Sequence, residues 1–338
     1  MQNAVEHEPQ ADSQRRRSSW RRVATLSAMG LVLLPYFYSR AASPFRRVMV
    51  FADSAIAESV PSQSAKQQLR VLTYNIAHGR GLAESNWAGG NAVQRRDRLE
   101  QIAQVLRDAD AEVVVLNEVD FDCSWSHSVN QAEFLADLAG YRYRVEQRNL
   151  DFRVLCWTWK FGNAILSKLP VKNAKVIDIP GYSKTETLVA GQKRCVSVDV
   201  EWGGRPITVI GAHLCHRSEE RRVESADVMV KNAQSSSRKT IIAGDLNSTA
   251  PGFPHAVIDA GNAISSLDAS NLFRRHPTEA PTSLGEFTFR SGKTQTLIDW
   301  IIIPSTADFE RYSVVNTDLS DHRPVWTDIR FDGSEQKQ

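Results

Sequence analysis

The 338-residue chain lacks several features that would assign it to a common class of protein. It has only four cysteines and no CxxC or HExxH pattern, which argues against a zinc site of those kinds. It has no internal repeat. The uncharged segment Val23–Ser39 has 17 residues, which is at the lower limit for a membrane-spanning helix.

A strong excess of charge of either sign is also missing, because the net charge is only +2. The charge is unevenly placed: residues 1–47 carry eight arginines and three acidic residues, a net of +5. The remainder has 33 basic and 36 acidic residues, a net of −3. This slightly acidic body argues against avid, sequence-independent binding of nucleic acid, which depends on Lys and Arg neutralising phosphates.

The N-terminal region divides into three segments by composition. Residues 1–22 form a basic head that we expect to be disordered, and residues 40–68 read as a linker. Val23–Ser39 is either a membrane anchor, the apolar core of a cleaved signal peptide, or, less consistently with its flanking charge, a buried helix. The basic head would stay in the cytoplasm, so we expect a membrane-anchored protein with its catalytic domain outside. Secretion after signal cleavage is the alternative.

Residues 69–332 are expected to form one folded domain in which strands and helices mix without strict alternation. That order favours an α/β sandwich of mixed sheets over a Rossmann or barrel fold. The central predicted strand is Thr240–Ala243, a β-branched apolar run that ends at Gly244. Amphipathic helices are predicted at Asn91–Asp108, Gln131–Leu138 and Ser218–Asn232. Gly203-Gly204 predicts a hairpin turn.

Polar side chains follow or interrupt several of the predicted strands. An acid inside the apolar run TLIDWIII is costly without a partner, so Asp299 is expected to pair with His322. Each polar residue alone has an ordinary explanation as a cap or a turn. Together they form the candidate site: Asn75, Glu118, His213, Asp245, Asn247, Asp299, Asp321 and His322.

This set suits a hard divalent cation. Mg²⁺ prefers one or two carboxylates together with water and a substrate phosphate oxygen. Glu118 could supply the carboxylate, with Asn75 or Asp321 nearby. His213 and His322 could handle protons near neutral pH, each oriented by an acid.

The ordered motifs resemble the endonuclease/exonuclease/phosphatase superfamily, which has the deoxyribonuclease-I-like fold. The matching pieces run in the family's order across Leu69–Arg330, and they are LTYNIAHG, VVVLNEVD, GNAILSK, VIGAHL, IIAGDLNS, LIDWIII and SDHRPV. The resemblance implies a four-layer sandwich, with two mixed sheets packed face to face, helices outside, and the site at one end. It also implies metal-assisted attack of water on a phosphoester, first of all a phosphodiester, with Mg²⁺ and alternatively Mn²⁺.

The resemblance further implies individual roles. Glu118 would be the main metal ligand, with Asn75 in or beside its shell and Asp321 helping with metal or water. Asp245 and Asn247 would position the attacking water and the phosphate. The two histidine roles complete the set: His213 would stabilise or protonate a phosphate oxygen, and His322 with Asp299 would be a general base or a phosphate clamp.

The substrate stays open between a phospholipid or other small phosphoester and nucleic acid. The segment Asp120–Lys160 departs from the subgroups of the family, and its aromatic residues could stack on a base, cover a lipid head group or simply pack on the core. In an exported body, a Cys123–Cys156 disulfide is expected. The alternative function is a non-catalytic, membrane-tethered binding module that kept the fold. We expect a monomer, and no protein partner can be inferred.

Overall fold

The computed structural model describes residues 10–42, 47–53, 68–257, 261–291 and 294–331. The described helices are α1 (Gln10–Ala42), α2 (Ala92–Ala109), α3 (Gln131–Ala139), α4 (Lys184–Ala190), α5 (Glu219–Gln234) and α6 (Ala263–Ala269). The strands are β1 (Val48–Ala52), β2 (Gln68–Asn75), β3 (Val113–Cys123), β4 (Tyr143–Val154), β5 (Trp157–Ser167), β6 (Lys172–Asp178), β7 (Arg194–Trp202), β8 (Arg205–His213), β9 (Lys239–Asp245), β10 (Phe273–Arg275), β11 (Phe289–Ser291), β12 (Thr294–Thr296), β13 (Asp299–Pro304), β14 (Ala307–Val314) and β15 (Val325–Phe331).

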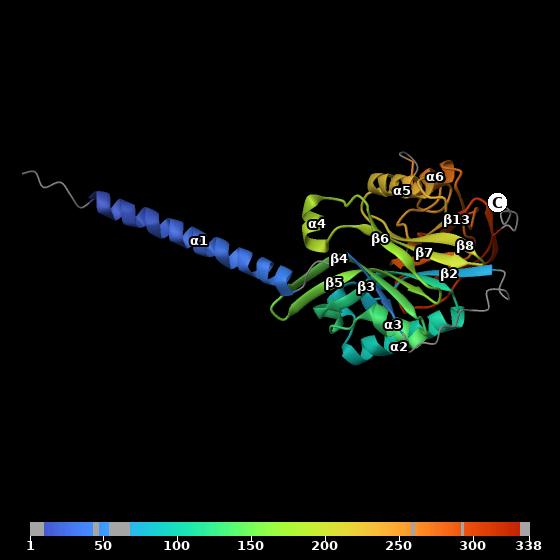
Figure 1. Cartoon of the computed structure of the whole chain (residues 1–338), viewed down its shortest axis with the longest axis horizontal. Helices are drawn as coiled ribbons and strands as arrows, with labels where there is room; N and C mark the ends of the chain where they lie inside the picture. Colours follow the sequence, from blue (N-terminus) through green and yellow to red (C-terminus); the bar gives the residue numbers. More distant parts are fainter. Residues whose placement is uncertain (1–9, 43–46, 54–67, 258–260, 292–293, 332–338) are drawn as a thin grey trace, which may run out of the picture. The chain divides into compact units, whose positions relative to one another are not determined.

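The strands form two large mixed sheets and a small hairpin. The seven-stranded sheet has the order β1-β4-β5-β3-β2-β15-β14, and the six-stranded sheet has the order β10-β13-β9-β8-β7-β6. β11 and β12 pair with each other. In the body of the molecule, α2 and α3 lie outside the first sheet and α5 and α6 outside the second (Figure 1). The predicted four-layer sandwich is therefore confirmed.

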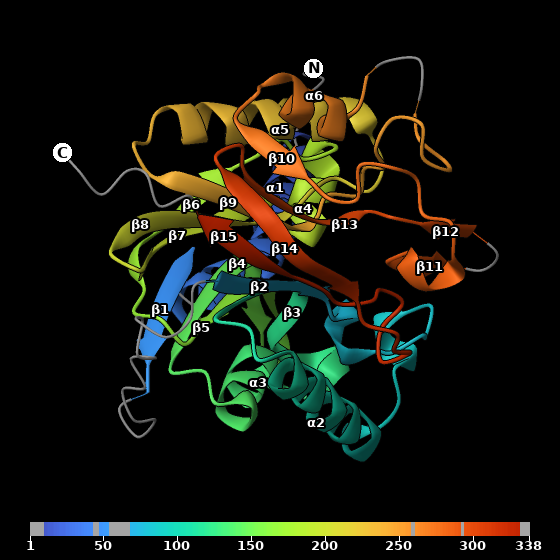
Figure 2. The same cartoon turned by 90° about the vertical axis from the view of Figure 1, so that its right-hand side faces the viewer.

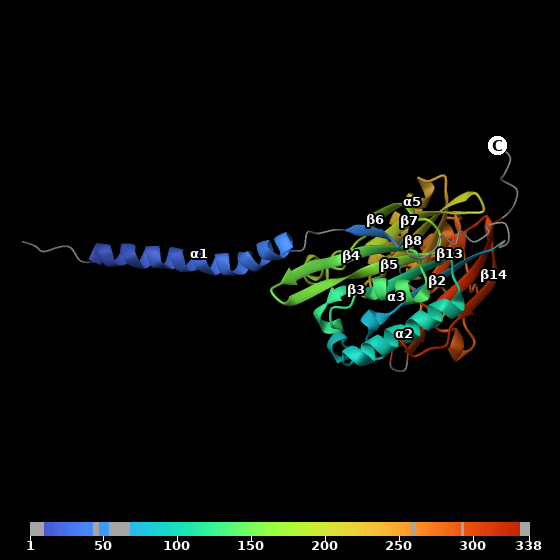
Figure 3. The same ribbon diagram turned by 60° about the horizontal axis from the view of Figure 1, so that its bottom comes forward.

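The core explains why the central strands are apolar on both faces. On β3, Val113 and Val115 point into the layer between the sheets, whereas Val114 and Leu116 pack under α2 and α3. β9 divides its side chains in the same way between the inner layer and the layer under α5 and α6. Each strand therefore buries both faces and reads as a continuous apolar run. Figure 2, an end view, and Figure 3, with α2 and α3 brought forward, show these layers.

Several local predictions agree with the structure in detail. Asn91 caps α2 by a capping box with Gln94, and Gly140 ends α3 in the left-handed conformation. Gly203 and Gly204 both have positive φ and join the antiparallel strands β7 and β8. Gly244 differs from its predicted role, because β9 continues through it to Asp245. A Cβ there would lie 1.8 Å from the Ala212 carbonyl oxygen, so the close approach of β8 requires the glycine.

The N-terminal region differs from the sequence prediction. From Gln10 onward the predicted disordered head is part of α1, which runs on through Val23–Ser39 to Ala42. Arginine and alanine are good helix formers, so a polar composition did not exclude a helix. Residues 1–9 of the head lie outside the described residues. Among the helices that are described, none is long and apolar enough to cross a membrane.

The folded body begins earlier than predicted. β1 falls inside the predicted 40–68 linker and pairs antiparallel with β4, so that Val48 lies opposite Gln147. The rest of that linker from 54 to 67 lies outside the described residues. The expected Cys123–Cys156 disulfide is wrong, since the structure has both thiols free, with Cys123 buried and Cys156 exposed.

Candidate active site

Sheet topology brings the predicted polar residues to one end of the sandwich. β2 and β3 are parallel, and the last residue of β2, Asn75, lies opposite Asn117, which directly precedes Glu118 in the middle of β3. In the other sheet, β8 and β9 are parallel and place His213 opposite Asp245. β13 runs antiparallel to β9, so its first residue, Asp299, also lies opposite Asp245. The carboxyl ends of β2, β8 and β9, the middle of β3 and the start of β13 therefore meet, on a rigid scaffold of the kind that often positions functional residues.

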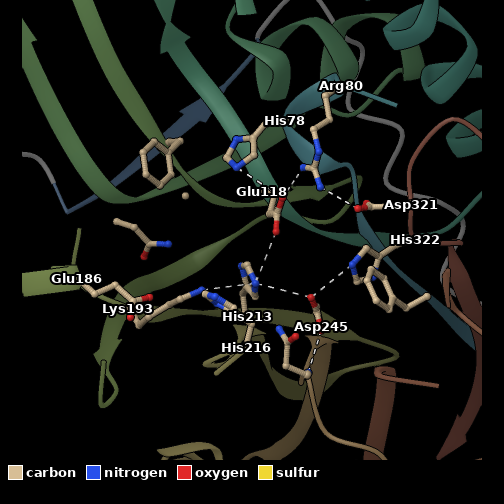
Figure 4. Close-up of a pocket in the computed structure, with 15 residues that line it drawn as sticks. His78, Arg80, Glu118, Glu186, Lys193, His213, His216, Asp245, Asp321 and His322 are labelled. Atoms are coloured by element: carbon tan, nitrogen blue, oxygen red, sulfur yellow. Dashed lines mark hydrogen bonds and ion pairs between the residues drawn. The ribbon is translucent and has the colours of Figure 1, made fainter. Parts of the chain in front are cut away.

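These side chains surround a pocket of about 340 Å³. Of the eight predicted site residues, six line it: Glu118, His213, Asp245, Asn247, Asp321 and His322. Figure 4 shows Glu118 and Asp321 near Arg80, and His213, Asp245 and His322 following one another across the pocket. A volume of this size suits a small ligand, and a few convergent polar groups are typical of a binding site.

The two remaining predicted residues support the pocket from behind and do not line it. Asn75 is buried, and its Nδ2 donates to Asp245 Oδ2 at 3.0 Å while its Oδ1 accepts from the backbone N–H of Ala77. Asn75 therefore joins the two sheets and fixes Asp245. Asp299 is fully buried, and its Oδ2 lies 2.8 Å from His322 Nδ1. The predicted pairing of Asp299 with His322 is confirmed.

Asp245 is held from three sides. Its backbone N–H donates to the side-chain oxygen of Asn117 at 2.9 Å, and its Oδ1 accepts from the backbone N–H of Asn247 at 2.9 Å. Asn247 has left the strand and adopts a left-handed φ of 50°, and its Nδ2 donates to the Leu214 carbonyl. Asn247 lies beyond the end of β9, so strand alternation does not set its direction, and the tight turn brings both Asp245 and Asn247 to the pocket.

His322 lies between two buried carboxylates. Its Nδ1 contacts Asp299, and its Nε2 lies 3.8 Å from Asp245 Oδ2. Burial alone would lower the pKa of His322, but the charges of Asp299 and then Asp245 outweigh it and raise that pKa to about 10. Burial raises the pKa of Asp245 to about 7, against the opposing charge of His322. The three side chains therefore share charge and protons as one unit.

Glu118 occupies an unusual backbone position. It lies at an irregularity in β3, where the register to β5 shifts between Leu116 and Val119, and its φ is +51°. Bulges and left-handed non-glycine residues are enriched at functional sites because they redirect a side chain at a cost in strain. The carboxylate of Glu118 is thereby turned into the pocket. Burial would raise the pKa of Glu118, but the charges of His78, His213 and Arg80 outweigh it and lower that pKa below its usual value.

His78 and Arg80 are among the pocket residues that the sequence interpretation missed. Arg80 bridges two carboxylates, donating from Nη1 to Glu118 Oε2 at 3.1 Å and from Nη2 to Asp321 Oδ2 at 2.7 Å. His78 Nε2 lies 3.5 Å from Glu118 Oε2. Both residues belong to the run AHGRG directly after β2, whose two glycines have positive φ. That clustering of glycine with basic residues at a strand end was the available signal.

His78 is itself oriented by an acid. Its Nδ1 lies 2.7 Å from Asp120 Oδ1, and the other oxygen of Asp120 accepts from Trp125 Nε1 at 2.8 Å. The pocket therefore contains a second histidine–carboxylate pair, on the opposite side of Glu118 from His213. Trp125 packs edge-on against His78, at a ring-centroid distance of 5.9 Å. Trp125 therefore packs beside the pocket and supports the His78–Asp120 pair, and the predicted roles of the aromatic residues of this segment stay predictions.

His213 connects Glu118 to the far side of the pocket. Its Nε2 lies 3.6 Å from Asp245 Oδ2 and 3.9 Å from Glu118 Oε1, and Lys193 Nζ lies 3.5 Å away. Burial first, and then the charge of Lys193, hold the pKa of His213 well below its usual value. His213 is therefore neutral near pH 7 and able to share a hydrogen bond with a phosphate oxygen.

The carboxylates of Glu118 and Asp321 fit a divalent cation. Both side chains are mostly buried yet line the pocket, and Arg80 binds one oxygen of each. The second oxygens are the candidate ligands of a hard metal, and that of Asp321 also accepts a 3.3 Å hydrogen bond from Ser320 Oγ. Asn75 fits less well than predicted, because it does not line the pocket and its oxygen already accepts a backbone hydrogen bond. Side-chain ligand atoms of Asp245, Asp299 and His322 also lie within 4.8 Å of one another. Their closeness follows from the shared hydrogen bond and ion pairs, so the first pair remains the better site.

The comparisons with known proteins agree with this geometry. A comparison with curated proteins found no match. Among solved structures, an endonuclease/exonuclease/phosphatase from Beutenbergia cavernae is similar, with 21% identity, a TM-score of 0.58, and coverage of 80% of this chain and 73% of that one. A mannosyl-6-phosphatase of Bacteroides thetaiotaomicron has 16% identity and a TM-score of 0.56, covering 78% of this chain and 100% of that one. A humanized D. rerio TDP2 has 14% identity and a TM-score of 0.52, covering 78% and 99%.

At these identities the structural likenesses show the fold alone. The sequence itself carries the assignment further, because the model of the Endonuclease/Exonuclease/phosphatase family matches residues 72–322. That range contains every residue of the candidate site and well over half of the chain. The chain therefore belongs to the endonuclease/exonuclease/phosphatase family.

Proposed function

We propose that this protein is a divalent-metal-dependent hydrolase that cleaves phosphoester bonds, above all phosphodiesters, in a phospholipid or another small phosphoester. Family membership supports phosphoester hydrolysis in general. The acidic body and the small pocket favour a small substrate over nucleic acid. Mg²⁺ is the proposed cation, with Mn²⁺ as the alternative.

The observation that carries the proposal is the arrangement of one metal-compatible carboxylate pair beside one buried Asp–His–Asp unit. Arg80 joins Glu118 to Asp321, and His322 lies next to Asp321, between Asp245 in the pocket and Asp299 behind it. A phosphate between them would meet both a cation site and groups that can move protons. That combination is what hydrolysis of a phosphoester requires.

In this proposal each side chain has a definite task. A bound cation, held by Glu118 and Asp321, would supply Lewis-acid stabilisation of the charge on the phosphate. Asp245, fixed by Asn75 and by the backbone N–H of Asn247, orients the attacking water.

The bond changes follow from that placement. The water oxygen forms a bond to phosphorus, and the phosphorus–oxygen bond to the leaving alcohol breaks. One proton of the water passes to the Asp245–His322 unit, and the leaving oxygen takes one proton from solvent water, so that the unit returns its own proton to solvent and the products are the alcohol and the phosphate. His213 and Arg80 donate hydrogen bonds to phosphate oxygens, where negative charge develops.

The proposal is tested with a phosphoester panel and the purified chain. Bis-p-nitrophenyl phosphate, p-nitrophenyl phosphate, phosphoinositides, sphingomyelin and an oligonucleotide are each assayed with Mg²⁺, with Mn²⁺ and with excess EDTA. We expect metal-dependent hydrolysis of at least one small ester. Full activity in excess EDTA would contradict the metal requirement, and binding without turnover of every ester would favour a binding module.

We also propose that Val23–Ser39 attaches the protein to a membrane with the body outside the cytoplasm. The support is the arginine-rich head before an uncharged segment.

A further inference from the structure

The far end of the pocket, away from Asp321 and His322, is lined by polar groups that the hydrolytic chemistry does not use. Glu186 on α4 and Lys193, just before β7, line it together with His216. In Figure 4 Glu186 and Lys193 lie at one side of the pocket, Asp321 and His322 at the other, and His213 between them. The place for a phosphate and this polar end therefore belong to one continuous pocket.

Glu186 has an unsatisfied oxygen. Its Oε2 is shielded from solvent, and no residue that the structure describes donates a hydrogen bond to it. Leaving a buried carboxylate oxygen without a donor is costly, and such groups call for a specific explanation. Glu186 also lines the pocket, so its carboxylate is the acceptor that this end offers to a ligand.

Lys193 supplies the complementary group. Its ammonium carries three donors, and its contact with His213 Nε2 at 3.5 Å uses only one direction. The segment that carries it is fixed, because Gln192 N–H donates to the Asn149 carbonyl and a Cβ on Gly191 would lie 2.2 Å from the same oxygen. Lys193 is therefore held at the pocket wall by close backbone packing.

An acceptor and a donor at the same end of one pocket determine which ligand groups can bind there. A hydroxyl group both donates and accepts, so neighbouring hydroxyls of a polyol could satisfy Glu186 and Lys193 together. The carboxylate of Glu186 would repel a second phosphate, and the ammonium of Lys193 would repel a cationic head group. The opposite charges of the pair therefore favour a neutral polar group over either ion.

We infer that this end of the pocket binds the alcohol part of the substrate, and that this alcohol is a neutral polyol such as a sugar or inositol. The inference rests on the proposed phosphoester hydrolysis and adds the substrate class to it. Burial and the charge of Lys193 lower the pKa of His216, so His216 is neutral near pH 7 and adds no net charge to this end.

The test compares polyol esters with aryl esters of the same phosphate type. The kcat/KM values for glucose 6-phosphate and p-nitrophenyl phosphate give one ratio, and those for glycerophosphoinositol and bis-p-nitrophenyl phosphate give another. We expect Glu186→Gln to lower at least one ratio tenfold or more, because the amide presents a donor where the polyol needs an acceptor. Lys184→Gln, an exposed change on the same helix, is the matched control and should leave both ratios unchanged.

Equal losses on both kinds of ester would mean that Glu186 has only a structural role and would overturn the inference, as would a preference for an oligonucleotide. Vesicles containing phosphatidylinositol, assayed beside the soluble esters, distinguish a lipid head group from a free polyol phosphate.

A second readout does not need turnover. Binding of glucose 6-phosphate and glycerophosphoinositol in EDTA is measured by saturation-transfer NMR, and we expect Glu186→Gln to weaken it at least fivefold. If neither ester binds the unaltered protein, the polyol inference fails even when aryl esters are hydrolysed. If no ester of any kind is hydrolysed, the proposed function fails instead.

Discussion

The pair formed by Asp299 and His322 gives the sharpest quantitative prediction. Asp299 is fully buried and His322 is 5% exposed, and their hydrogen bond is 2.8 Å long. Removing one partner of a buried ion pair costs about 3–5 kcal/mol, because the other charge is left uncompensated. Here Asp245 remains on the other side of the ring and offsets part of the loss, so we expect Asp299→Asn to cost about 2–3 kcal/mol of unfolding free energy.

The same change should reduce activity in a non-additive way. Loss of a positioned acid–base group costs about 10²–10⁴-fold in rate. If Asp299 acts through His322, then Asp299→Asn combined with His322→Ala should lose no more activity than the worse single variant. The stability changes should show a coupling of about 1 kcal/mol or more in the same cycle.

The cycle is measured by urea unfolding in EDTA and by kcat/KM with saturating Mg²⁺. Asp308→Asn is the matched control, since Asp308 is partly exposed and paired only with surface arginines, and it should change stability by less than about 1 kcal/mol. Activity losses that multiply cleanly, together with a coupling below about 0.5 kcal/mol, would refute the idea of a unit.

Three further predictions concern the metal, pH and location. Arg80→Met should tighten Mg²⁺ binding several-fold by calorimetry, because a positive charge between the two carboxylates is removed; weaker binding would mean that Arg80 only holds them in place. Burial would raise the pKa of Asp328, but the charges of Arg70 and then Arg311 outweigh burial and lower that pKa. The ionised Asp328 therefore stabilises the folded state above about pH 4, and this stabilisation is lost as the pH falls through the lowered pKa. Asp328→Asn should therefore destabilise at pH 7, and the destabilisation should shrink as the pH falls below about 4, as measured by urea unfolding over a pH series; an effect that does not change with pH would contradict the charge argument. Cell fractionation should find the full chain with the membranes and its body open to external protease if residues 23–39 anchor it; a shortened soluble product means signal cleavage, and full-length protein in the cytosol contradicts both.

The sequence was informative wherever a polar group stood out from an apolar strand. Asp299 and Asp245 follow or interrupt runs that are buried on both faces, and a polar group there needs a reason. Because neighbouring parallel strands end at the same edge of a sheet, residues that are far apart in the sequence could be predicted to lie in one site. The helical periodicity of α2 and the capping residues of α3 could also be predicted from the sequence, since they depend on local interactions.

Features that depend on tertiary contacts could not be predicted from the sequence. β4 was missed because its sequence, YRVEQRNLDFRV, shows no apolar alternation. Its buried polar side chains satisfy one another: Arg144 and Arg148 both lie near Glu146, and Gln147 accepts from Asn163. A strand stabilised by such a network cannot be told from a loop by hydrophobic pattern alone.

The active-site residues that were missed have the same explanation. His78 and Arg80 follow β2 in a glycine-containing turn, where basic residues are ordinary. Only the fold shows that this turn meets Glu118, and only the bulge at Glu118 turns its carboxylate toward them. Lys193 and Glu186 were likewise unremarkable until the packing of the α4 region against β4 placed them at the pocket.

The measurement that tests the central claim most directly is the metal dependence of Glu118→Gln. The purified variant and the unaltered protein are compared for Mg²⁺ binding by calorimetry, for hydrolysis of bis-p-nitrophenyl phosphate, and for thermal unfolding. A metal ligand that is not part of the core predicts activity lower by orders of magnitude and Mg²⁺ binding at least tenfold weaker, with stability within about 1 kcal/mol of the unaltered protein. Mg²⁺ binding and hydrolysis that are both unchanged in Glu118→Gln would contradict the account.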